Sequence, residues 1–174
     1  MSELFTDLEI VTARKCVVEL EFIPSWVGYR QVLGRPFKLG AAVGCRDGRL
    51  KIEGDSARQW VMWSDDSVLD GRFDCIPKRG QTAHIFVYNT WTYDDRNTEF
   101  GALNAGLLIE VVGPNSFRLR CNSGPQNAGL FTDSTILVTV HGADDASYFG
   151  VLPTEGAPDA GERIRLIPTA LSGM

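Results

Sequence analysis

The dominant pattern along the chain is an alternation of apolar and polar residues with a period of two. Between Cys16 and Phe22 every second position is apolar, and Glu19 and Glu21 stand between these positions. Successive side chains of a β-strand point to opposite faces of the sheet. The segment is therefore predicted to be a strand with one buried face and one face in water.

Similar short apolar runs recur along the chain, separated by turn residues. Further strands are expected at residues 37–45, 50–52, 59–63, 72–76, 83–92, 106–112, 116–121, 135–140 and 163–167. Asp47-Gly48 is typical of a tight turn between two strands, because glycine tolerates a positive φ. No long window shows helical periodicity, although residues 2–11 have room for one helical turn. Many short strands with few or no helices predict an all-β fold, a two-sheet antiparallel β-sandwich.

Composition and charge narrow the class of protein. With 174 residues, 44% of them hydrophobic, the chain is expected to form a single β-sandwich domain over residues 1–174. The net charge of −5 argues against nucleic acid as a partner. No apolar run is long enough for a membrane span. The first residues do not follow the signal-peptide pattern, so we expect a cytoplasmic location or export by a signal-free route.

The four cysteines, Cys16, Cys45, Cys75 and Cys121, lie far apart in the sequence, and none belongs to a CxxC pair. Each falls in or beside an expected strand. Buried free thiols in a reducing compartment are the favoured interpretation, and disulfides remain the alternative. A zinc site is disfavoured because its paired cysteine spacing is missing.

Catalytic motifs are missing from the sequence. The two histidines, His84 and His141, have no motif that would supply a catalytic partner, and GxSxG, HExxH and P-loop spacings do not occur. The expected class is therefore a protein that is not an enzyme. A triad that assembles only in space stays open.

Acidic loops are the better candidates for ligand binding. Asp65, Asp66 and Asp70 lie in one loop, and Asp94 and Asp95 lie in another. Calcium takes about six to eight oxygen ligands, often from several carboxylates. Loops that share one end of the sandwich would supply such a site. The alternative is a solvated acidic surface that favours solubility.

Four aromatic residues raise the question of a sugar-stacking surface. Trp60 and Trp63 differ by three positions, so in a strand they face opposite ways. Trp91 and Tyr93 share one face with Val87 and other apolar residues. Core packing is therefore the favoured role of the second pair.

Several segments together resemble the TerD family of tellurium-resistance and stress proteins. The resemblance covers most of the chain and rests on short motifs in the family's order. These motifs are Asp47-Gly48-Arg49-Leu50, Trp60-Val61-Met62-Trp63, Ile76-Pro77, Tyr93-Asp94, Arg96, Phe100-Gly101, Asn104-Ala105 and the closing Phe149-Gly150. The resemblance implies a non-enzymatic binding or assembly protein of a stress-response system.

The family's calcium-binding run is where this chain departs from the pattern. The family carries an Asp-x-Asp-x-Asp-Ala type of run, and Pro36, Lys38 and Gly40 stand at the matching places here. Proline and glycine offer no side-chain oxygen, and an ammonium group repels Ca²⁺. We therefore expect a degenerate calcium site with no resident metal, and leave weak coordination by the remaining acids open. Lys38 would replace the cation by pairing with an Asp or Glu.

Further expectations concern an alternative function, the loop that holds Arg96, and partners. A carbohydrate-binding or toxin-like β-sandwich that acts outside the producing cell is the alternative function. Arg96 is expected to hold its loop by pairing with Asp94 or Glu99. Edge strands leave a homo-oligomer possible, but no residue specifies one. The protein partner or small ligand is not specified either.

Overall fold

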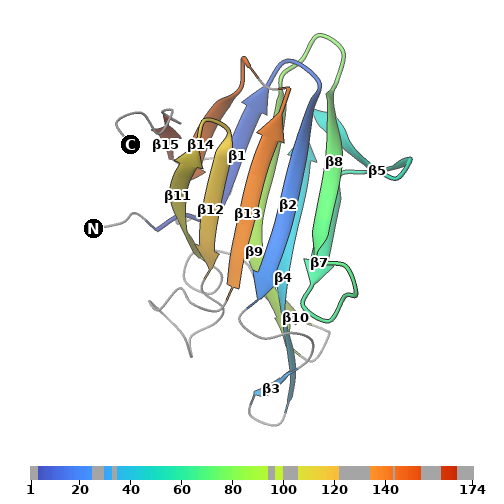
Figure 1. The fold of residues 1–174 in the computed structure, drawn as a ribbon, viewed down its shortest axis with the longest axis vertical. Helices are drawn as coiled ribbons and strands as arrows, with labels where there is room; N and C mark the ends of the chain where they lie inside the picture. Colours follow the sequence, from blue (N-terminus) through green and yellow to red (C-terminus); the bar gives the residue numbers. More distant parts are fainter. Residues whose placement is uncertain are drawn as a thin grey trace.

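Every regular element in the described part of the chain is a β-strand, as the alternation predicted. The computed structural model describes residues 4–24, 30–32, 35–93, 97–99, 106–121, 134–142, 144–153 and 162–167. The strands pack as two antiparallel sheets, one behind the other (Figure 1). The predicted β-sandwich is confirmed.

The first sheet has eight strands. Its main path is β15 (Arg163–Leu166), β14 (Ser147–Val151), β1 (Asp7–Thr12), β9 (Ala83–Tyr93), β4 (Arg35–Arg46) and β3 (Arg30–Val32). Two more strands pair outside this path, β10 (Asn97–Glu99) with β9 and β7 (Gln59–Trp63) with β4.

The second sheet has seven strands. Its order is β11 (Leu107–Gly113), β12 (Ser116–Cys121), β13 (Ser134–His141), β2 (Cys16–Pro24), β8 (Asp70–Pro77), β5 (Gly48–Ile52) and β6 (Asp55–Ala57). The β5 hairpin projects beyond β8 at the right of Figure 1. Three of its six pairings, β13 with β2, β2 with β8 and β8 with β5, join strands that are not consecutive in the sequence.

The core lies between the two sheets and follows the period-two pattern. On β2 the side chains of Cys16, Val18, Leu20 and Phe22 are buried, whereas Glu21 is exposed. Both sheets contribute to one continuous cluster of buried hydrophobic residues. Strands β2, β12 and β13 thus bury one face, as expected for a sandwich, whereas β6 and β15 at the sheet edges have no buried residue.

Two local predictions need correction. Residues 7–12 form strand β1, so the helical turn considered for residues 2–11 is wrong there. At the turn between β4 and β5 it is Asp47, with φ 59°, and not Gly48 that takes the positive φ. Gly48 is needed for space, since a Cβ there would lie 2.8 Å from the carbonyl oxygen of Ile76.

The stretch after β9 begins a hairpin. Residues 97–99 form β10, which pairs back onto β9 with Asn97 opposite Tyr93. Asp94, Asp95 and Arg96 lie outside the described residues, as do positions 100–105. The predicted pairing of Arg96 and the ligand role of the two aspartates therefore stay predictions.

Candidate functional site

Lys38 on β4 lies in an ion pair at the outer face of the first sheet. Its Nζ is 3.6 Å from Oδ2 of Asp65, and the exposed fractions of the two side chains are 18% and 37%. The ammonium group also lies 5.4 Å from the ring centroid of Trp63, within cation–π range. The charge of Lys38 is therefore balanced by protein groups in a partly desolvated place.

Backbone bonds hold Asp65 beside Lys38. The N–H of Ser64 donates to the carbonyl of Leu39 at 2.8 Å, and the N–H of Leu39 donates to Oγ of Ser64 at 3.1 Å. Oδ2 of Asp66 accepts the N–H of Trp63 at 2.8 Å, which closes the turn after β7. The turn thus uses one carboxylate for its own structure and presents the other to Lys38.

Gly40 lies two residues beyond Lys38 and has no room for a side chain. A Cβ at this position would lie 2.8 Å from both Cγ2 of Thr90 and Cζ3 of Trp63. Because Cβ contacts below 3.0 Å require neighbours to shift, the packing of Trp63 disfavours any larger residue at position 40. A carboxylate there would displace the ring that contacts Lys38.

The structure separates the acids that the sequence grouped together. Asp65 and Asp66 lie at the Lys38 site, whereas Asp70 begins β8 in the other sheet, opposite Glu21. Asp94 and Asp95 lie outside the described residues. Within the described ranges, no group of three or more His, Cys, Asp and Glu residues is arranged to hold a metal ion.

The aromatic residues divide as the strand pattern indicated. Trp91 is buried in the core, with an exposed fraction of 8%. Trp60 is 39% exposed, and its ring centroid lies 6.4 Å from that of the buried Phe73. Trp63 packs on the opposite face over Gly40. The side chain of Tyr93 is not among the described ones.

Both histidines have carboxylate partners. Nδ1 of His84 lies 2.8 Å from Oε2 of Glu9, a fully buried carboxylate that also bonds Arg163. Nε2 of His141 lies 3.4 Å from Oε1 of Glu19. The first contact joins β1, β9 and β15, and the second joins β13 and β2.

Three of the four thiols meet where the two sheets come together. The Sγ atoms of Cys45 and Cys75 are 3.9 Å apart, and Cys16 lies opposite Cys75 in the register of β2 and β8. Hydrogen bonding to Cys16 and Cys45, together with burial, raises the pKa of Cys75. Its S–H group in turn lowers the pKa of Cys45, which is only half-buried.

All four cysteines are free thiols in the structure. Sequence reasoning missed the cluster, because its members lie on three strands and are 29 and 30 positions apart. Only the register of β2 with β8, and the packing of β4 against β8, bring them into contact.

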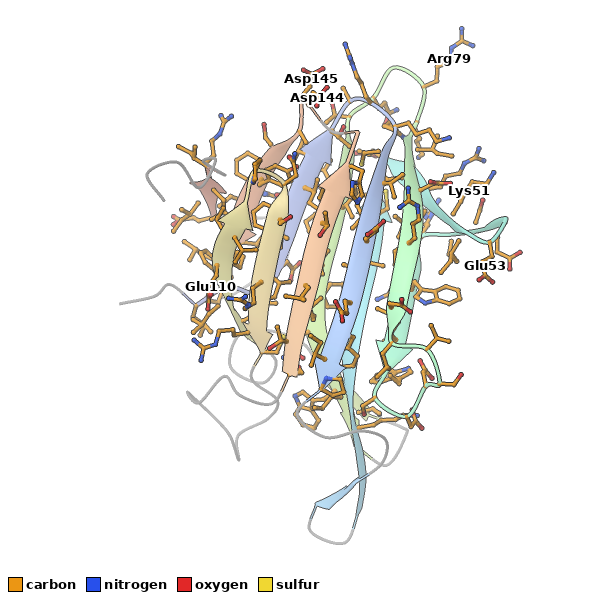
Figure 2. All side chains as sticks on the ribbon, viewed as in Figure 1. Lys51, Glu53, Arg79, Glu110, Asp144 and Asp145 are labelled. Carbon is orange, nitrogen blue, oxygen red and sulfur yellow. The ribbon has the colours of Figure 1, made fainter. Side chains whose placement is uncertain are left out.

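An acidic groove runs along the second sheet between β2, β8 and β5. It has a volume of about 860 Å³. Charged residues that line it include Glu19, Glu21, Lys51, Glu53, Asp70 and Arg72. Figure 2 shows Lys51 and Glu53 on the projecting β5 hairpin. Of the candidate acids, Asp70 alone has its place in this groove among the described residues.

A basic pocket follows the groove along the same strands β5 and β8. It has a volume of about 580 Å³, and its charged lining residues are Arg49, Arg58, Lys78 and Arg79. All four are exposed, and none forms an ion pair with another described residue. Arg79 lies on the loop above β8 (Figure 2). Sequence reasoning missed this site because the four cations are spread over 31 positions.

Comparisons with known proteins give no assignment. No protein-family model, no curated protein and no solved structure matches the chain. A search of the described residues for a helix with the length and apolarity of a membrane span found none.

Proposed function

We propose that this protein is a non-enzymatic binding protein of a stress-response system, similar to the TerD family, with a lysine ammonium in place of a calcium ion. The observation that carries the proposal is the ion pair of Lys38 with Asp65, 3.6 Å long, beneath which Trp63 lies. Lys38 stands at the centre of the stretch that matches the family's calcium-binding run. Its positive charge would stabilise the neighbouring carboxylate in place of the metal ion.

The chemistry of the surroundings supports this replacement. A calcium ion needs about six to eight oxygen ligands, whereas one ammonium group needs one carboxylate and a few neutral acceptors. Asp65 supplies that carboxylate, and Asp66 is occupied by the N–H of Trp63. At Gly40 the packing leaves no space for a third ligand.

A binding role also agrees with the interactions of the histidines. His84 is held by the buried Glu9, and His141 by Glu19. These contacts join neighbouring strands, and we interpret them as structural.

The test replaces Lys38 by Ala or Asp and measures the Tm of each variant with and without Ca²⁺. For the wild-type protein we expect no change in Tm with millimolar Ca²⁺, and for Lys38→Ala a loss of about 1–2 kcal/mol, because Asp65 loses its charged partner. Lys38→Asp creates a carboxylate next to Asp65 and should acquire a calcium-dependent rise in Tm. Lys51→Ala, a lysine on the other sheet, is the control and should lose less than Lys38→Ala.

Two outcomes would contradict the proposal. One is a wild-type protein that is stabilised by Ca²⁺. The other is a Lys38→Ala variant whose Tm equals that of the wild type, which would show that the ammonium has no structural role.

A carbohydrate-binding sandwich is the second candidate, and the acidic groove is the observation that favours it. Carboxylates such as Glu21 and Asp70 line this groove and are able to accept hydrogen bonds from sugar hydroxyls. Binding on a glycan array that Asp70→Asn abolishes would support this function over the first.

A further inference from the structure

The basic pocket concentrates positive charge on a chain whose net charge is −5. Arg49 comes from β5, Arg58 follows β6, and Lys78 and Arg79 follow β8. None of the residues that line the pocket is an Asp or Glu. We propose that this pocket binds a ligand that carries phosphate groups.

The register of β5 and β8 places no acid opposite Arg49, the one pocket cation that lies in a described strand pair. Arg49 lies opposite Ile76, and Gly48 lies opposite Pro77. Like charges gathered in one concave place repel each other, and an anion that enters removes this repulsion. The same anion gains charge-assisted hydrogen bonds from several donors at once.

Backbone hydrogen bonds hold the segments that carry the cations. The N–H of Lys78 donates to the carbonyl of Asp47 at 2.9 Å, and the N–H of Gln81 donates to the carbonyl of Lys78 at 2.9 Å. The second bond closes a turn in which Gly80 has a φ of 73°. The carbonyl of Arg58 accepts the N–H of Cys45 at 2.8 Å. A ligand therefore meets a preformed backbone and orders only side chains.

The lining residues point to phosphate as the recognised group. A guanidinium presents paired donors that match phosphate oxygens, and three of the four cations are arginines. The volume of about 580 Å³ exceeds the space that one phosphate ion fills. Ala57, Ile76 and Pro77 add an apolar surface for the rest of the molecule. The ligand is thus a phosphate ester or a polyphosphate, either free in solution or as a lipid headgroup.

The primary experiment measures the binding of inorganic tripolyphosphate to the full chain by calorimetry, with Tm as a second readout. The wild-type protein should bind the probe and show a raised Tm. The double variant Arg58→Gln/Lys78→Gln should bind at least about tenfold more weakly. A single hydrogen bond to a charged group contributes roughly a factor of ten in affinity, and the variant removes two charged donors. Far-UV circular dichroism verifies that the variant is folded.

The matched control is Arg165→Gln, an exposed arginine on β15 outside the pocket. It removes a cation from the other sheet and should leave tripolyphosphate binding unchanged. An equal loss of binding in this variant would mean that the probe responds to overall charge, which would overturn the proposal.

Vesicles distinguish the two sources of phosphate. Cosedimentation with phosphatidylglycerol vesicles but not with phosphatidylcholine vesicles, lost in the double variant, would identify a lipid headgroup. Binding of tripolyphosphate without cosedimentation would identify a soluble ligand.

Absence of both kinds of binding would overturn the proposal. Tighter binding of poly-glutamate than of tripolyphosphate would do so too, because the pocket would then recognise acidic protein segments. The calcium and Lys38 measurements do not enter these outcomes, so this proposal and the proposed function fail separately.

Discussion

The acidic groove and the basic pocket lie one after the other along β5 and β8. They differ in which residues the strand register places opposite their charged side chains. In the groove, Arg72 lies opposite Glu19 and ion-pairs with it, and Asp74 lies opposite Lys51. In the pocket, the residue opposite Arg49 is the apolar Ile76. The register of the strands pairs part of the charge in the groove with opposite charge, although Asp70 lies opposite Glu21, and it places no acid opposite Arg49 in the pocket.

Charges that lack a cross-strand partner are the ones an external ligand would pair with. Cross-strand pairs of opposite charge stabilise a sheet. Several charged side chains of the groove therefore already have a partner of opposite charge within the protein. Cations that lie near the ends of strands have no such partner and keep their capacity for an external anion. We therefore expect an anionic ligand in the pocket to stabilise the protein more than a ligand in the groove would.

We expect the strongest destabilisation from a side chain at Gly48, which lines the pocket and has no room for a Cβ. In Gly48→Ala the new Cβ would lie 2.8 Å from the carbonyl oxygen of Ile76 and 3.1 Å from Sγ of Cys45. We expect a loss of about 3 kcal/mol in the free energy of unfolding, because backbone cannot move aside cheaply. Urea denaturation measures this loss.

Gly44→Ala on β4 is the matched control, since its Cβ would meet only the carbonyl oxygen of Arg58 at 3.7 Å. Its stability should stay close to that of the wild type. Equal losses in the two variants would contradict the role given to Gly48.

Asp7 is another charged residue without an opposite charge across the strands, and in this case the residue is an acid. The register places Asp7 opposite Tyr88 on one side and Val151 on the other, and burial raises its pKa to about 6. The folded protein therefore holds this proton more tightly than the unfolded chain does. The contribution of Asp7 to stability is full below about pH 4 and is lost as the pH rises through about 6.

Asp7→Asn should accordingly raise the free energy of unfolding by about 2 kcal/mol near neutral pH and flatten its decline between about pH 4 and 6. Denaturation curves over this pH range provide the measurement. If the wild-type stability rose across the same window and the variant removed that rise, the pKa of Asp7 would have to be lowered instead.

A smaller effect is expected from breaking the cross-strand pair of the groove. Arg72 and Glu19 are 62% and 42% exposed, so Arg72→Gln should cost about 0.5 kcal/mol, and less at high salt. Arg118→Gln breaks the similarly exposed pair with Glu110 on β12 and β11 and is the matched comparison. A loss of several kcal/mol at Arg72 alone would show that the groove depends on this pair.

The smallest effect concerns the like charges that the groove retains. Asp70 lies directly opposite Glu21, so Asp70→Asn should stabilise the protein by about 0.3 kcal/mol at low salt. Asp74→Asn removes an acid that lies opposite Lys51 and should change stability in the other direction. Thermal unfolding at two salt concentrations compares the pair, and the same sign in both would refute the register argument.

Local patterns predicted most of the strands but not β1, β3, β6 and β10, and they did not predict the sites. The alternation on β2 and the apolar run of β9 were sufficient to predict the sandwich, because they follow from the two faces of a strand. The hypothesis that Lys38 pairs with an acid matches the contact with Asp65. The local sequence did not indicate that Asp70, at the end of the loop that holds Asp65, begins β8 and pairs with Glu21 in the other sheet.

Neighbouring residues alone were enough to indicate which face of β2 is buried, that the chain turns near Asp47, and that no side-chain oxygen stands at positions 36, 38 and 40. These are properties of neighbouring residues. The tertiary structure alone decided which charges meet, which thiols touch, and that four scattered cations form one pocket. The physical reason is that strand order and register join distant segments, and these pairings are decided by the burial of the whole core.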